Sequence, residues 1–116
     1  MVVDDSRVIH SQMSKILQET DFEIVQFCRD GESAVEAYGN CKPDIVTIDI
    51  IMPGMDGLET SKEILTKWPD AKILVASSLA YDETIEEAEK LGAKGFISKP
   101  LNKEEIVNAL NRALEE

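Results

Sequence analysis

The sequence has no long hydrophobic segment and only two cysteines. No apolar run in its 116 residues approaches the ~18 residues that a membrane-spanning helix needs, and no signal peptide opens the chain. We therefore expect a cytoplasmic protein with no membrane partner. Cys28 and Cys41 lack the spacing of a metal site, and we expect both to be small, buried, hydrophobic side chains.

Positive charge is also scarce. The chain has 12 Lys and Arg against 23 Asp and Glu, which gives a net charge of -11 and a pI near 4.5. Nucleic-acid binding depends on Lys and Arg side chains that neutralise phosphates, so we expect no direct nucleic-acid partner. An acidic surface also keeps a small protein soluble. The charge therefore excludes one class of partner and identifies none.

What is present is a regular alternation of short apolar runs and helix-like segments. Hydrophobic residues make up 43% and charged residues 30% of the chain, as in an ordinary globular domain. Between the apolar runs, hydrophobic residues recur at helical spacing. The five runs are Met1–Val3, Ile24–Cys28, Ile45–Ile48, Ile73–Ala76 and Gly95–Ile97.

The five helix-like segments have apolar stripes and recognisable ends. Pro69 and Gly92 are helix-ending residues, Asp30 precedes a helix, and Asn102 followed by Glu105 has the spacing of an N-cap and capping box. The stripes, in chain order, consist of Ile9, Met13, Ile16 and Leu17; Ala34, Val35 and Tyr38; Leu58, Ile64, Leu65 and Trp68; Ile85, Ala88 and Leu91; and Ile106, Leu110 and Leu114.

Strands that alternate with helices predict right-handed crossovers and a parallel sheet covered by helices on both faces. We expect the α/β class and a single (βα)5 domain over residues 1–116. Spacing does not determine the strand order. A doubly wound, flavodoxin-like order such as 2-1-3-4-5 is the natural choice for five strands, with a crevice beside the first and third strands.

Polar residues follow four of the predicted strands. The first strand is followed by Asp4 and Asp5, the third by Asp49, the fourth by Ser77, and the fifth by Lys99. Each has an ordinary interpretation alone: a helix N-cap, a loop hydroxyl or a solvated charge. Together they converge on the carboxyl edge of a parallel sheet, where ligands bind in such folds.

This combination of side chains indicates phosphoryl chemistry. Three carboxylates in one crevice repel one another and should raise one another's pKa, and a divalent cation relieves the repulsion. Oxygen ligands without His or Cys suit Mg2+, or Mn2+, better than zinc or copper. The Lys99 ammonium is then a fixed charge for an anion, and Ser77 adds a hydroxyl donor.

These residues also resemble a known pattern. Asp4-Asp5, Asp49 with the loop Met52–Gly57, Ser77, Phe96 and Lys99-Pro100 are similar to the motifs of CheY-like receiver domains of two-component response regulators. The similarity covers the whole chain and rests on several separated motifs. It implies the strand order 2-1-3-4-5 and a phosphorelay switch that is not an enzyme beyond its own phosphorylation and dephosphorylation.

The resemblance implies a role for each matched residue. Asp49 would accept a phosphoryl group from a sensor histidine kinase, a phosphotransfer protein or a small phosphodonor. Asp5, Asp49 and the Ile51 backbone carbonyl would bind Mg2+, with Asp4 acting through water. Lys99 would hold a phosphoryl oxygen, and the Lys99-Pro100 bond would be cis.

The same resemblance implies a switch. Ser77 would move to hydrogen-bond the phosphoryl group, and Phe96 would turn inward. The fourth helix, fifth strand and fifth helix would then change their affinity for an output protein or effector domain, in a monomer or a phosphorylation-dependent dimer. The Ser77-Ser78-Leu79 run resembles chemotaxis-type receivers.

Two positions that should flank the phosphoryl group are apolar here, where relatives often carry polar residues. Ile51 lies two residues after Asp49, and Leu79 lies two after Ser77. Apolar side chains cannot orient an attacking water. We hypothesise a long-lived aspartyl phosphate; the alternative is that both side chains point away from the site.

Two other functions share parts of this pattern. A Mg2+-dependent phosphohydrolase with an aspartyl nucleophile would carry a second Asp at position 51 and a cap over the site. A flavodoxin-like cofactor carrier would need a glycine-rich phosphate loop in place of Asp4-Asp5. We expect Gly54 and Gly57 to supply positive φ in a turn, and Trp68 to be a packing residue; His10 receives no role.

Overall fold

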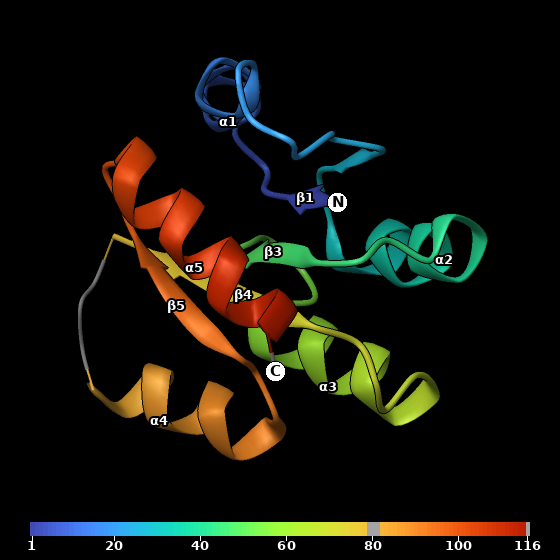
Figure 1. Ribbon diagram of the computed structural model, residues 1–116. Helices are drawn as coiled ribbons and strands as arrows, with labels where there is room; N and C mark the ends of the chain where they lie inside the picture. The colour runs from blue at the N-terminus through green and yellow to red at the C-terminus, as the bar shows by residue number, and fades with distance from the viewer. Residues whose placement is uncertain (79–81, 116) are drawn as a thin grey trace.

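The computed structural model describes residues 1–78 and 82–115, which form five strands and five helices around one sheet (Figure 1). The strands are β1 (Val2–Val3), β2 (Phe27–Cys28), β3 (Val46–Asp49), β4 (Ile73–Ser77) and β5 (Gly95–Ser98). The helices are α1 (Arg7–Leu17), α2 (Gly31–Cys41), α3 (Gly57–Lys67), α4 (Asp82–Leu91) and α5 (Lys103–Glu115). No helix in the described part of the chain is long and apolar enough to cross a membrane.

All pairings in the sheet are parallel, and the order is β2-β1-β3-β4-β5. The predicted α/β class and strand order are therefore confirmed. The direction of strand succession reverses between β1 and β3, which is where such folds form their ligand crevice. The ends of these two strands define the site described below.

Helices cover both faces of the sheet, as predicted. One core cluster joins α2, α3 and Ala88 of α4 to one face, and it includes the packed pair Tyr38 and Trp68. The other cluster joins α1 and α5 to the opposite face through Met13, Leu17, Ile106 and Leu110. The prediction that Leu114 belongs to the buried stripe of α5 is wrong, because this residue lies near the end of the helix and is 44% exposed.

The second strand is shorter than predicted. The run Ile24–Cys28 was expected to be a strand, but only Phe27 and Cys28 pair, with Val2 and Val3. A strand at the sheet edge can be only as long as the neighbour that it pairs with, and β1 has two residues. Val25 is accordingly 51% exposed.

The two cysteines differ in environment. Cys28 is buried and burial raises the pKa of its thiol, with a smaller contribution from Asp30. Cys41 is exposed, so the prediction that it is buried is wrong. It is the last residue of α2, a position that faces solvent because the buried stripe of that helix ends at Tyr38.

Candidate functional site

The site is formed around two buried carboxylates at the carboxyl ends of neighbouring strands. Asp49 is the last residue of β3 and Asp4 directly follows β1. Asp49 is only 7% exposed and Asp4 only 2%. Buried carboxylates are uncommon unless they are paired or bind a cation, so this pair needs positive charge nearby.

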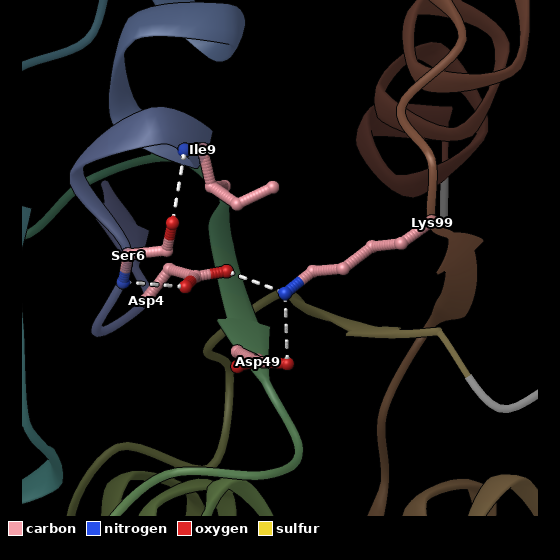
Figure 2. Close-up of polar contacts among 5 residues, drawn as sticks. All are labelled: Asp4, Ser6, Ile9, Asp49 and Lys99. Atoms are coloured by element: carbon pink, nitrogen blue, oxygen red, sulfur yellow. Dashed lines mark hydrogen bonds and ion pairs between the residues drawn. The ribbon is translucent and has the colours of Figure 1, made fainter.

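Local turn geometry directs Asp4 into the site. The backbone N–H of Ser6 donates to Asp4 Oδ1 at 2.9 Å, and the Ser6 hydroxyl accepts from the N–H of Ile9 at 3.4 Å (Figure 2). Ser6 is therefore the N-cap of α1. Because Ser6 serves as the cap, neither Asp4 nor Asp5 has that ordinary role, and the second oxygen of Asp4 is available to the site.

Lys99 connects the two buried carboxylates. Its Nζ atom lies 2.8 Å from Asp4 Oδ2 and 3.1 Å from Asp49 Oδ1, and Figure 2 shows the side chain reaching from the end of β5 across to β1 and β3. The side chain of Lys99 is only 16% exposed. The peptide bond between Lys99 and Pro100 is cis, as the resemblance implied.

The charges in this cluster shift one another's pKa. Burial raises the pKa of Asp49, the charge of Asp4 raises it further, and Lys99 opposes both effects. For Lys99, burial alone would lower the pKa, but the hydrogen bond to Asp4 and the charge of Asp49 raise it above its usual value. Lys99 therefore keeps its positive charge at neutral pH, whereas Asp49 is held in an environment that resists its negative charge.

The acidic cluster fits a divalent metal ion. Asp4, Asp5 and Asp49 each present a carboxylate oxygen, and these oxygens lie within 4.8 Å of one another. Asp5 is exposed while the other two are buried, so an ion would have one open side toward solvent. Oxygen donors of this kind match Mg2+ or Mn2+. The Ile51 carbonyl as a further ligand stays a prediction.

The predicted switch residues lie on the two strands beyond β3. Ser77 is the buried last residue of β4, and Asp49 is aligned with its neighbour Ala76. Phe96 in β5 is aligned with Val75 and is half-buried against the core cluster that contains α2 and α3. Ile51 is 60% exposed. Leu79 lies outside the described residues.

Gly54 and Gly57 shape the loop after Asp49 for different reasons. Gly54 has a φ of +74° and nothing within 4 Å of its absent Cβ, so the prediction of positive φ is confirmed for this residue. For Gly57 the prediction is wrong, because the positive-φ glycines are Gly54 and Gly92. A Cβ on Gly57 would lie 2.1 Å from the carbonyl oxygen of Asp49. The start of α3 thus packs directly against the backbone of Asp49.

Two contacts were missed by the sequence analysis. His10 stacks on Phe27 with ring centroids 4.6 Å apart. The expected capping box of Asn102 and Glu105 forms only in part. The N–H of Glu105 donates to Asn102 Oδ1 at 3.0 Å, but the Glu105 carboxylate accepts from Ser98 and not from the N–H of Asn102. Spacing predicted the cap, but it could not show that the end of β5 lies within reach of the same side chain.

Fold and site together define a small α/β domain with a lysine-bridged acidic cluster at the switch point of a doubly wound sheet. Comparison with known proteins then identifies the family. The family model described as "Response regulator receiver domain" matches residues 1–111. The chain belongs to the response regulator receiver domain family.

Individual relatives agree with this assignment. The chain is 40% identical to the chemotaxis protein CheY of Listeria monocytogenes over 97% of its own length and 95% of that protein. It is equally identical to CheY of Thermotoga maritima, with 97% and 93% covered. A CheY of Borrelia burgdorferi, solved in complex with CheX, BeF3 and Mg2+, superimposes with a TM-score of 0.89 and 35% identity over 94% of this chain and 83% of that one.

The receiver of a different kind of protein also matches. The response regulator domain of Thermotoga maritima CheB has a TM-score of 0.91 and 32% identity, with 99% of this chain and 94% of that domain covered. Receiver domains are phosphoacceptor signalling switches rather than classical enzymes, typically bind Mg2+, and interact with kinases and effectors. This class of function is therefore established for the chain.

Proposed function

We propose that Asp49 is the phosphoacceptor of this receiver and that Asp4, Asp5, Lys99 and Ser77 assist its phosphorylation. The observation that carries the proposal is the position of the Asp49 carboxylate. It ends a fully buried strand, lies 3.1 Å from the Lys99 ammonium, and has carboxylate oxygens of Asp4 and Asp5 within 4.8 Å. The proposal is supported by the presence, at this position, of one cation and of three carboxylates that could hold a metal ion.

The chemistry follows from these charges. An oxygen of Asp49 attacks the phosphorus of the donor, the bond from phosphorus to the donor's nitrogen or oxygen breaks, and the leaving group departs with that electron pair. Lys99 offers its ammonium to a phosphoryl oxygen in place of Asp4 or Asp49. Asp4, Asp5 and Asp49, with the Ile51 carbonyl, would hold Mg2+ or Mn2+, and such an ion would supply further positive charge for the transferred group.

Phosphorylation would act on the output face through Ser77 and Lys99. A dianionic phosphoryl group attracts the Ser77 hydroxyl and the Lys99 ammonium, which lie at the ends of β4 and β5. Phe96 then fills the space that this shift opens. It has no hydroxyl, so its inward position rests on packing. The surface formed by α4, β5 and α5 would thereby change its affinity for a partner.

The partners proposed are a sensor histidine kinase or phosphotransfer protein as donor, and an output protein or effector domain as target. Whole-length similarity to CheY proteins favours a chemotaxis-type pathway and a receiver that spans the entire chain, residues 1–116. We further propose a cytoplasmic protein, without a nucleic-acid partner because of the charge of -11. It is a monomer or a dimer that forms on phosphorylation.

The test is a phosphorylation experiment with acetyl phosphate, Mg2+ and radiolabelled phosphate. The proposal predicts at most one phosphoryl group per chain, loss of labelling in Asp49→Asn, and normal labelling in the control Asp44→Asn, an exposed carboxylate just before β3. Labelling that survives in Asp49→Asn would overturn the assignment. Rapid multiple turnover of a phosphate ester would instead favour the phosphohydrolase that shares this set of residues.

A further inference from the structure

Lys99 directly follows β5, the last strand of the sheet. The aligned residues Ser77 and Ser98 end the ladder between β4 and β5, and the N–H of Lys99 donates to the carbonyl of Ser77 as the last bond of that ladder. In a parallel strand the N–H groups of successive residues point to opposite sides. The N–H of Ser98 therefore points away from β4, toward the open edge of the sheet.

Glu105 accepts this outward-pointing backbone donor. Because β5 is an edge strand, no further strand of the described residues lies beside it to accept the N–H of Ser98. Here the Ser98 N–H donates to Glu105 Oε1 at 2.8 Å. The Ser98 hydroxyl adds contacts of 2.9 and 3.0 Å to the two oxygens of the same carboxylate. Hydrogen bonds to a carboxylate are among the stronger ones in proteins.

Glu105 also contacts Asn102, at the far end of the segment 99–102 that links β5 to α5. Its own N–H donates to the side chain of Asn102 at 3.0 Å, and the carbonyl of Asn102 accepts from the N–H of Ile106. Ser98, just before this segment, and Asn102, at its end, are therefore both hydrogen-bonded to Glu105 in the first turn of α5. A carboxylate at that position is further stabilised by the helix dipole.

We propose that Glu105 is a positioning residue for Lys99. Its carboxylate holds the backbone and hydroxyl of Ser98, and this fixes the start of the adjacent Lys99 side chain, whose ammonium reaches both Asp4 and Asp49. The same contacts attach the Lys99 segment to the first turn of α5, so movement of Lys99 toward a phosphoryl group is transmitted to that helix. This inference rests on the proposed function, because it assigns Glu105 to the phosphorylation site centred on Asp49.

The test compares Glu105→Ala with the matched control Glu104→Ala, which removes an exposed carboxylate from the same helical turn. In Glu105→Ala we expect phosphorylation by acetyl phosphate to slow about tenfold, the effect of one lost hydrogen bond to a charged group. The Ser98 amide should exchange its hydrogen faster in the metal-free protein. Mg2+ affinity should not fall, because the carboxylates stay in place. Glu105→Gln, which keeps one acceptor oxygen, should recover part of the rate.

A double variant separates positioning from general loss of structure. In a Lys99→Ala background, Glu105→Ala should cause no further decrease in rate, because Glu105 acts through Lys99. An equal loss in both backgrounds would overturn the inference, as would a normal rate in Glu105→Ala while the unmodified protein is phosphorylated on Asp49. If the unmodified protein is not phosphorylated, the proposed function itself fails, and faster exchange of the Ser98 amide still reports on the contact.

Discussion

Lys99 Nζ lies 3.1 Å from Asp49 Oδ1 and 2.8 Å from Asp4 Oδ2, so one ammonium is shared by two buried carboxylates from adjacent strands. This arrangement explains how the protein tolerates its acidic cluster before any phosphoryl group arrives. It also places the cation that the transferred group needs beside the proposed acceptor.

Removal of the ammonium should impair phosphorylation more than metal binding. We expect Lys99→Ala to lower the rate of phosphorylation by acetyl phosphate about 100-fold, as for the loss of one preorganised charge-stabilising group. Mg2+ affinity should be retained or increase, because a competing cation has gone. Lys94→Ala, an exposed lysine just before β5, is the control and should match the unmodified protein. A parallel loss of Mg2+ affinity in Lys99→Ala would mean that the lysine mainly organises the carboxylates.

The raised pKa of Asp49 predicts a pH-dependent gain in stability on neutralisation. The folded protein resists the ionised form of Asp49, since burial and Asp4 raise its pKa above the ordinary value of 3.8. Above the raised pKa, ionised Asp49 destabilises the folded state relative to the unfolded chain. Asp49→Asn should therefore raise the melting temperature by a few degrees at neutral pH without metal.

This gain should shrink as pH falls through the raised pKa of Asp49 and vanish below 3.8, where the unfolded chain is protonated as well. Melting curves of both proteins in EDTA across this range provide the measurement. A gain that is constant with pH would show that charge is not its cause.

The loop after Asp49 predicts unequal costs for two glycine substitutions. Gly57→Ala would place a methyl group 2.1 Å from the Asp49 carbonyl oxygen and 2.6 Å from Ile50 Cα, and we expect it to cost about 3 kcal/mol, the upper range for overpacking. Gly54→Ala has open space but a φ of +74°, and should cost only about 1 kcal/mol. Urea unfolding measures both values; equal costs would contradict the close packing of α3 on Asp49.

The apolar residues at positions 51 and 79 predict a slow loss of phosphate. Ile51 is largely exposed and, with Leu79, would leave an attacking water without a polar partner. We expect Ile51→Asn combined with Leu79→Glu to accelerate dephosphorylation about tenfold, less than the ~100-fold of a full general base. Ile51→Val with Leu79→Ile is the apolar control. An unchanged decay rate would show that neither side chain affects the attacking water.

The sequence was most informative where a local pattern determines structure. The acidic and basic residues at strand ends could be placed together because parallel strands share one carboxyl edge, and this is where Asp4, Asp49 and Lys99 meet. The prediction failed where the structure depends on contacts between segments that are distant in the sequence. Gly57 is required by its approach to Asp49, and the Ser98 contact of Glu105 depends on how close the end of β5 lies to the first turn of α5.

The remaining errors also have physical causes. Val25 belongs to an apolar run of strand type, but β1 offers no partner beyond Val2 and Val3. Cys41 and Leu114 carry apolar side chains near the ends of helices, beyond the last residue of the buried face. Hydrophobicity alone gives no information about where an element ends.

Whether Asp49 accepts the phosphoryl group can be determined by mapping the modified residue with mass spectrometry. The protein is incubated with acetyl phosphate and Mg2+, digested at once under conditions that preserve acyl phosphates, and compared with a sample in EDTA. We expect a single phosphoryl group, present only with Mg2+, on the peptide that contains Asp49. A phosphoryl group on another residue, or one that forms equally in EDTA, would contradict this expectation.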